Sequence, residues 1–395
     1  MKWEKVKLGE LYEVHNGLSK AGKFFGEGYP FLTFSTVFNN YFIPKQITDL
    51  VQSTEKEQES YSIRRGDVFV TRTSETSDEL GMSCVALKDY PMATYNGFTK
   101  RMRPITNRVF PEYIGYYMRL TSFRGEFRAF STMTTRASLR NEDLLGLEVK
   151  LPSIEIQKQI AEILLAYDDL IENNQKQIKL LEEAAQRLYK EWFVDLRFPG
   201  HENTKIVDGV PEGWNEKTLS QVANVIMGQS PKSEFYNSEK KGLPFHQGVG
   251  SYGVRFVMDD IYSTSYTRIA EPSSILFSVR APVGRLNITK NKVVIGRGLA
   301  AINQTDGCQS YLYYLLKNKF FKDNIVGNGS IFASVSKDEL LNQKFLIPER
   351  NLMMQFEKIV SQMDKQIENL DSKNKKLIEA RDRLLPKLMS GEVEV

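Results

Sequence analysis

The sequence predicts an α+β fold in which two mixed α/β globular domains are separated by two long antiparallel coiled-coil helices, with an internal pseudo-twofold repeat. Three observations predict it: a length of 395 residues, a sequence repeat, and two stretches of heptad spacing. A chain of this length exceeds one typical core and fits two domains with connecting elements. We therefore divide the chain into a first domain, 1–150; a central helix and linker, 151–200; a second domain, 201–350; and a C-terminal helix, 351–395.

The repeat is visible at both ends of each domain. Trp3, Gly17 and their neighbours recur 211 positions later, around Trp214 and Gly228. Near the domain ends the shift settles at 196, because the loops differ in length, and it then continues without a gap through a helical stretch. Matching pairs at this shift are Ala137/Ala333, Leu144/Leu340, Ile163/Ile359, Asp168/Asp364, Ile171/Ile367, Leu181/Leu377 and Leu188/Leu384.

Both helical stretches place apolar residues at the alternating three and four spacing of a coiled-coil seam. About 35 residues make a rod of roughly 50 Å, and an apolar stripe on such a rod requires a partner helix. The repeat itself is the nearest partner, which predicts antiparallel pairing. The seam residues are Ile156, Ile160, Ile163, Tyr167, Leu170, Asn174, Ile178, Leu181, Ala185, Leu188 and Trp192 in the first helix, and Phe356, Val360, Met363, Ile367, Leu370, Asn374, Leu377, Arg381, Leu384 and Leu388 in the second.

Asn174 and Asn374 interrupt the two seams. Two interpretations are open: a buried Asn that fixes the register of the helices, or an Asn that faces solvent near a bend. Within the domains, short runs rich in Val, Ile and Phe predict strands at 67–71, 274–279 and 293–295, and amphipathic patterns predict matching helices at 113–120 and 311–316. Short strands alternating with Gly, Pro and Ser turns are consistent with a curved sheet in each domain.

The formal net charge of +4 conceals two basic blocks. Residues 1–150 hold 21 Lys and Arg against 18 Asp and Glu, and residues 201–350 hold 18 against 14. Two weakly basic DNA-facing surfaces are consistent with this distribution, and so is chance. The two cysteines, the charged amino terminus and the lack of a long apolar run predict a soluble protein of a reducing cytoplasm, with no membrane association.

Two motifs resemble cofactor loops and fail on closer inspection. Residues 24–28 match the F-x-G-x-G pattern of adenine methyltransferases, but Tyr29 and Pro30 follow where a helix should begin, and no D/N-P-P-Y tetrad is present. Residues 17–24 approach a phosphate loop, but Phe24 occupies the position of the required Ser or Thr. His15, His201 and His246 are isolated from other metal-ligating residues. The sequence therefore predicts no catalytic residue and no metal site.

The segments around the helices carry a resemblance to a known family. They are the stretches 151–160 (LPSIEIQKQI), 168–171 (DDLI), 192–195 (WFVD), 210–214 (VPEGW) and 381–393 (RDRLLPKLMSGEV). Together they resemble the conserved regions of Type I restriction-modification specificity subunits, in the order of that family. The second domain adds 278–284 (SVRAPVG) and 295–300 (IGRGLA), which resemble a common subtype of target-recognition domain. The amino terminus departs from the pattern, since Trp3 lacks the Pro-x-Gly that precedes Trp214.

The resemblance implies a noncatalytic subunit that reads double-stranded DNA. It implies two target-recognition domains, each reading one half of a bipartite site in the major groove, and helices that set the spacer. It also implies two methylation subunits that bind S-adenosylmethionine, and two restriction subunits that use ATP and Mg²⁺ to translocate DNA. The rival hypotheses are a degenerate methyltransferase, a nuclease with an unrecognised site, and a purely structural coiled-coil adaptor.

Polar loops next to strand ends are the candidate DNA contacts, because Arg reads guanine with two hydrogen bonds and hydroxyl groups bind phosphates. For any single arginine, a structural salt bridge remains an equal alternative. The candidates are Arg72, Thr73, Ser74, Lys100, Arg101, Thr134, Thr135 and Arg136 in the first domain, and Gln229, Lys232, Arg280, Arg285, Arg297, Asn328 and Ser330 in the second.

Overall fold

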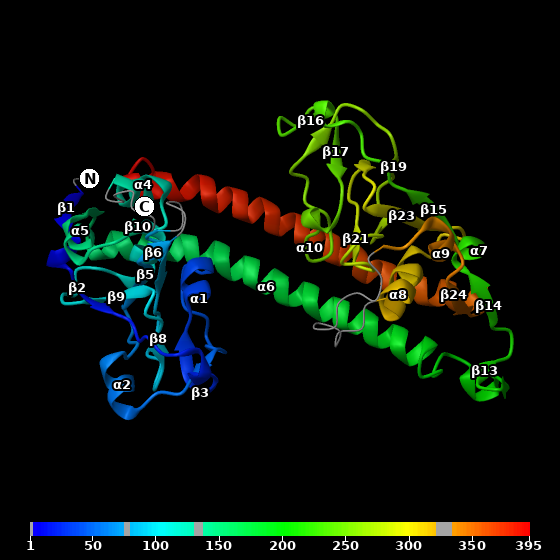
Figure 1. Ribbon diagram of the computed structural model, residues 1–395, viewed down its shortest axis with the longest axis horizontal. Coiled ribbons are helices and arrows are strands. Elements are labelled where there is room, and N and C mark those ends of the chain that lie inside the picture. The colour runs from blue at the N-terminus through cyan, green and yellow to red at the C-terminus, as the bar shows by residue number, and fades with distance from the viewer. Residues whose placement is uncertain (1–2, 75–79, 130–136, 321–333) are drawn as a thin grey trace. The chain divides into compact units, whose positions relative to one another are not determined.

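A computed structural model describes residues 3–74, 80–129, 137–320 and 334–395, and the chain divides into two compact units. The first unit comprises 1–173 with 373–395, and the second comprises 174–372. Each unit thus contains one domain and a half of each long helix, α6 (Ile154–Phe193) and α10 (Arg350–Ser390). Figure 1 shows α6 in green and α10 in orange to red. The four-segment division made from the sequence stays a prediction.

The domain of the first unit combines short strands and short helices, which confirms the α+β prediction. Its elements are β1 (Glu4–Lys7), β2 (Tyr12–Asn16), β3 (Phe25–Leu32), α1 (Phe34–Asn39), β4 (Leu50–Val51), α2 (Glu55–Ser60), β5 (Val68–Thr71), β6 (Thr73–Ser74), β7 (Ser83–Val85), β8 (Thr94–Tyr95), β9 (Thr99–Pro104), α3 (Pro111–Tyr117), α4 (Thr121–Ala129), β10 (Ala137–Ser138), α5 (Asn141–Gly146) and β11 (Glu148–Leu151).

The domain of the second unit shares its sheets with the first but differs in some of the segments that precede and connect them. Its elements are β12 (Ile206–Val207), β13 (Val210–Pro211), β14 (Asn215–Thr218), α7 (Leu219–Val222), β15 (Ala223–Met227), β16 (Tyr236–Asn237), β17 (Leu243–His246), β18 (Tyr262–Ser263), β19 (Ile269–Ala270), β20 (Ile275–Ser278), β21 (Leu286–Ile288), β22 (Val293–Ile295), β23 (Leu299–Gln304), α8 (Gln309–Phe320), α9 (Lys337–Leu341) and β24 (Lys344–Ile347). Strands β12 and β13 precede the repeat, and the described segment between β15 and β20 has strands where the first domain has α1 and α2. The strands and helices predicted at 67–71, 274–279, 293–295, 113–120 and 311–316 correspond to β5, β20, β22, α3 and α8.

The pairing of strands confirms the internal repeat. A four-stranded antiparallel sheet has the order β2-β9-β5-β7 in the first domain and β15-β23-β20-β21 in the second. The strands that open and close each copy of the repeat pair as β1 with β11 and as β14 with β24. Each domain also has one parallel pair, β3 with β8 and β17 with β22. The central strands β5 and β20 are buried at every position, as their Val, Ile and Phe side chains predict.

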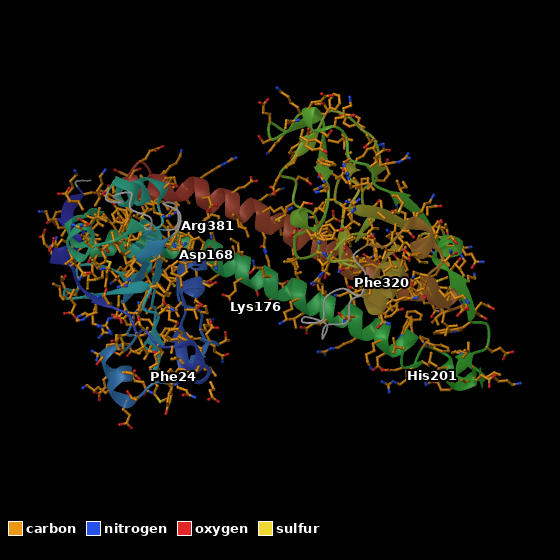
Figure 2. All side chains as sticks on the ribbon, in the orientation of Figure 1. Phe24, Asp168, Lys176, His201, Phe320 and Arg381 are labelled. Atoms are coloured by element: carbon orange, nitrogen blue, oxygen red, sulfur yellow. The ribbon has the colours of Figure 1, made fainter. Side chains whose placement is uncertain are left out.

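Within each unit the two long helices run antiparallel. In the first unit Asp168 of α6 pairs with Arg381 of α10, and Ile171, later in α6, meets Asn374, earlier in α10. In the second unit Tyr189 and Trp192, near the end of α6, pack against Phe356, near the beginning of α10. Figure 2 shows Asp168 and Arg381 beside one another. The antiparallel pairing predicted from the repeat is therefore confirmed.

The seam prediction holds better for α10 than for α6. Asn374 is buried and donates a hydrogen bond to the carbonyl oxygen of Ile171 at 3.4 Å, which favours the register interpretation over the solvent-facing one. Leu170, however, is 51 % exposed, and the neighbouring Ile171 is buried in its place, so the prediction for Leu170 is wrong. The buried face of α6 is wider than a coiled-coil seam, because Ala161 and Leu164 also belong to the core of the first domain.

Among the described residues, no helix contains a stretch that is both long and apolar enough to cross a lipid bilayer.

Candidate nucleic-acid interface

Four chain segments meet at one edge of the second domain and fix each other through backbone hydrogen bonds. The turn after β22 donates from Gly296 N to His246 O at 2.8 Å, and from Gly298 N to Gln247 O at 3.2 Å. Val279 N donates to Gly298 O at 2.9 Å, and Gln229 N donates to Ile295 O at 3.0 Å. The ends of β15, β17 and β20 are thereby held around the β22–β23 turn. We call this arrangement the second-domain turn cluster.

The first domain builds the same arrangement from different residues. Asn96 N donates to Leu32 O at 3.0 Å, Arg72 N donates to Phe98 O at 3.0 Å, and Leu18 N donates to Tyr95 O at 2.8 Å. From these bonds, Leu32 occupies the position equivalent to His246, and Phe98 the position equivalent to Gly298. The ends of β2, β3 and β5 are therefore held around the β8–β9 turn, which we call the first-domain turn cluster.

The second-domain turn cluster borders an open cavity of about 170 Å³ that two predicted arginines line. Arg280 follows β20 and Arg297 lies in the β22–β23 turn, and the side chains of both are exposed. Gln247, which follows β17 and is also exposed, lines the same cavity. No hydrogen bond or ion pair engages these three side chains within the described parts of the chain. Their hydrogen-bonding groups can therefore bind the edges of bases or the phosphates of DNA.

Ser278 holds the turn that carries Arg280. Its hydroxyl donates to Pro282 O at 2.6 Å and accepts from Arg285 N at 2.8 Å. Gly284 N closes the turn by donating to Ser278 O at 3.0 Å. The backbone position of Arg280 is therefore fixed, although its side chain is exposed.

The first-domain turn cluster carries other side chains at the equivalent positions. Phe98, 56 % exposed, stands where the second domain has Gly298, and Gly97 stands where it has Arg297. Arg72 donates to Asn16 Oδ1 at 3.4 Å, so it is partly engaged within the domain. The two clusters thus share a backbone and differ in the chemistry they present.

Lys100 and Arg101 lie inside the first domain rather than on its surface. Lys100 is 5 % exposed and its ammonium contacts Asn141, while Arg101 is 3 % exposed and donates to Ser62 O at 2.7 Å. Burial lowers the pKa of Arg101, and burial followed by the nearby Arg72 lowers the pKa of Lys100. Both side chains therefore have polar partners within the domain, and neither presents its charge to solvent.

The remaining predicted contacts are dispersed or not described. Thr73 and Ser74 form strand β6, which pairs with β10. Lys232 is exposed and lies 3.8 Å from Glu234; Gln229 borders the second-domain turn cluster, since Arg297 N donates to the adjacent Ser230 at 3.2 Å. Arg285 is exposed and lines a separate cavity of about 320 Å³. The residues outside the described ranges are Thr134, Thr135, Arg136, Asn328 and Ser330.

Sequence reasoning missed Gln247 and Phe98. Gln247 directly follows a strand, so the reasoning that selected Gln229 would have found it had the strand at Leu243–His246 been predicted. Phe98 gave no such indication, because an aromatic residue in a turn is ordinarily assigned to a core. Gly17 and Gly228 were better indications, since each permits a close backbone approach that defines its cluster.

The described residues contain no group of three or more His, Cys, Asp and Glu side chains suited to a metal ion. His246 is fully buried and is hydrogen-bonded to Ser251 Oγ at 2.9 Å and to Asp259 Oδ1 at 3.1 Å. His246 is therefore a buried, hydrogen-bonded histidine. This contact network joins β17 to the following loop and supports the second-domain turn cluster.

We expect Gly228→Ala to disrupt the second-domain turn cluster. A Cβ atom at Gly228 would lie 2.1 Å from Gly296 O, a backbone atom held by its own hydrogen bonds. The backbone must shift to avoid this clash, and the shift should lower the free energy of unfolding by about 1 to 3 kcal/mol. The control is Gly250→Ala, where a Cβ would have no neighbour within 4 Å. Urea unfolding of the two variants measures the difference, and equal stabilities would contradict a close-packed cluster.

Comparison with known proteins supplies the family. The family model described as the Type I restriction modification DNA specificity domain matches residues 1–183 and again residues 211–380. A putative type I restriction enzyme MjaX specificity subunit of Methanocaldococcus jannaschii is 28% identical, with 100% of this chain and 94% of that protein covered. The type I restriction enzyme HindI specificity subunit of Haemophilus influenzae is 24% identical, with 99% of each covered.

A solved structure has the same fold. The crystal structure of the Type-I restriction-modification system S subunit from M. genitalium superimposes with a TM-score of 0.60 at 17% identity, over 98% of this chain and 96% of that chain. The two successive family matches coincide with the two copies of the structural repeat. The resemblance noted in the sequence and the prediction of a noncatalytic recognition subunit are thereby confirmed. The chain belongs to the Type I restriction modification DNA specificity domain family, whose role is DNA target specificity.

Proposed function

We propose that the chain reads a bipartite DNA target, with each domain contacting one half-site in the major groove. The observation that carries this proposal is the second-domain turn cluster, where Arg280, Arg297 and Gln247 line one cavity with uncommitted side chains. The equivalent cluster of the first domain supports a second reading surface of the same build. Rigid turns with varied exposed side chains suit direct readout, because base discrimination requires fixed donors and acceptors.

We further propose that α6 and α10 set the spacing between the half-sites. The helices have 40 and 41 residues, which corresponds to about 60 Å each at about 1.5 Å per residue. A buried Asn in the seam supports one fixed register. A helix pair of fixed register would act as a ruler for a nonspecific spacer.

The same helices are our candidate docking sites for two methylation subunits. Leu170 and Leu180 of α6 and Ile359 and Ile378 of α10 are exposed by 51, 64, 42 and 38 %. Exposed apolar side chains of this size are the contacts that we assign to a partner subunit on these helices. In this proposal the methylation subunits bind S-adenosylmethionine, two restriction subunits use ATP and Mg²⁺, and this chain binds DNA without a cofactor of its own.

Exchange of one domain tests independent reading. Residues 1–150 would be replaced by the equivalent domain of a relative, and the assembled complex would be produced in a host whose methylated adenines are then sequenced. We expect one half of the methylated motif to change and the other half and the spacer to stay the same, because each domain has its own turn cluster. A change in both halves would contradict independent reading. Binding of S-adenosylmethionine by the purified chain would contradict the division of labour.

A further inference from the structure

The backbone of Gln247 is held in a fixed position, which restricts where its side chain can reach. Gln247 follows β17, and its backbone oxygen accepts from Gly298 N at 3.2 Å. The turn opposite packs directly against it: a Cβ at Gly298 would lie 2.4 Å from Gln247 O, and one at Gly296 would lie 3.0 Å from Gln247 Cα. A side chain at Gly298 would clash with this approach, and one at Gly296 would be tightly confined, so the backbone of Gln247 has little freedom to shift.

The residue before Gln247 fixes the strand end from the interior. His246 is fully buried, with one ring nitrogen 2.9 Å from Ser251 Oγ and the other 3.1 Å from Asp259 Oδ1. Its two partners follow Gln247 in the chain, so the histidine ties the segment after Gln247 back onto β17. A side chain supported in this way keeps its geometry when a ligand binds.

The chemistry around Gln247 is that of base recognition. Its amide provides one acceptor and two donors, the pattern that pairs with N6 and N7 of adenine. Arg280 and Arg297, which line the same cavity, carry the guanidinium groups that pair with O6 and N7 of guanine. All three side chains are exposed and come from three different strand ends.

Comparison of the two turn clusters distinguishes the side chains that could contact bases from the backbone that supports them. The first-domain residue equivalent to Gln247 is Thr33, whose hydroxyl accepts from Thr36 N at 3.3 Å and caps helix α1. The residue equivalent to Arg297 is Gly97, which has no side chain. Three backbone hydrogen bonds of the turn cluster recur in both copies, whereas the bond from Gly298 N to Gln247 O does not, since Phe98 N donates to Asn96 Oδ1 at 2.7 Å. The side chains differ as well, as expected for two readers of different half-sites.

From these observations we propose that Gln247 is a specificity-determining residue of the second domain and reads an adenine in a half-site that also contains guanine, which Arg280 and Arg297 read. The proposal rests on the proposed function, since it needs the second domain to contact DNA. It assigns a residue role and a base class to the cavity, and it predicts an A·T pair close to a G·C pair in the second half-site.

The test begins with the wild-type complex of the full chain and its partner subunits, whose motif is obtained by sequencing methylated adenines in the host. Duplexes carrying each single base-pair change in the second half-site are then bound by wild type, Gln247→Ala and the control Gln46→Ala. Gln46 is an exposed glutamine of the first domain outside its turn cluster. Thermal unfolding of the variants verifies their folding.

We expect Gln247→Ala to weaken binding to the wild-type site by about 5- to 150-fold, the fold-change of one bidentate contact. The variant should lose discrimination at one A·T pair only. Replacement of that adenine by 7-deazaadenine should weaken wild type by a similar factor and leave the variant unaffected. If Gln247→Ala lowers thermal stability, Gln247→Glu, which retains the side-chain size, should show the same loss of adenine preference.

Three outcomes would overturn the assignment of Gln247. They are unchanged discrimination at every position, an equal loss on all duplexes, and relaxation at a G·C pair or in the other half-site. If instead the wild-type complex methylated no bipartite motif, the proposed function itself would fail, so the two failures are distinguishable.

Discussion

Replacing Arg255 by methionine is expected to lower the free energy of unfolding of the second unit by about 3 to 5 kcal/mol. Arg255 is 2 % exposed, donates to Glu182 of α6 at 3.1 Å, and also binds Asp364 of α10. Its guanidinium lies 4.5 Å from the ring centre of Tyr313 in α8. Removal of this one cation would leave two carboxylates beside the domain core without their common partner.

Because Arg255 and Asp364 are ionisable, the effect of Arg255→Met on the free energy of unfolding should depend on pH. Burial lowers the pKa of Arg255, but Tyr313, Tyr314 and Asp364 raise it by more, so the guanidinium stays charged. Burial raises the pKa of Asp364, and Arg255 opposes that rise. Without Arg255 the pKa of Asp364 should rise further in the folded state. A folded state that holds a proton more tightly than the unfolded chain loses stability as pH rises. The loss in free energy of unfolding caused by Arg255→Met should therefore be largest at neutral pH and smaller at acidic pH.

Urea unfolding of the full chain, with hydrogen exchange to identify the second unit, measures this effect. The control is Arg268→Met, which removes an exposed arginine of the same unit and should change stability by about 0.5 kcal/mol or less. A triple variant, Arg255→Met with Glu182→Leu and Asp364→Leu, should recover much of the loss, because no buried charge remains unpaired. A stable single variant with no pH dependence would disprove the role of Arg255.

The long helices show which parts of the fold the sequence could predict. In α10 the heptad spacing identified Phe356, Val360 and Ile367, all fully buried. In α6 the spacing failed at Leu170, because the adjacent Ile171 is also apolar and is the residue that is buried and meets Asn374 of α10. Two neighbouring apolar residues satisfy the heptad pattern about equally well. Which of them is buried depends on tertiary contacts that no local pattern encodes.

The sequence could predict that the candidate site lies at strand ends. It could not predict which side chains are exposed there. Arg280 and Arg297 are exposed, while Arg101, of the same residue type, lies within β9 and is buried against Tyr95. The sequence predicted a loop at Arg101 where the structure has a paired strand, and burial of that strand depends on tertiary contacts. The parallel pair of β17 and β22 brings Gln247 to the cavity, and this pairing joins residues about 50 positions apart.

Loss of both Arg280 and Arg297 is expected to weaken DNA binding by at least about 30-fold, because each arginine in a base-reading role contributes about 1 to 3 kcal/mol. The two side chains line one cavity, so the double variant removes the guanidinium groups of the second-domain turn cluster together. Their exposure predicts little change in folding stability. The loss should be concentrated on the wild-type site, while binding to unrelated duplexes should weaken only slightly.

Titration of matched and unrelated duplexes at several salt concentrations distinguishes base reading from phosphate binding. An arginine bound to phosphate contributes equally on all sequences, and its removal reduces the salt dependence of the binding constant. An arginine that reads a base affects mainly the cognate site. The control Arg64→Ala removes an exposed arginine of the first domain outside its turn cluster. If the double variant lost affinity equally on every duplex, the two arginines would be phosphate contacts, and the second domain would have to read its half-site through Gln247 and other side chains.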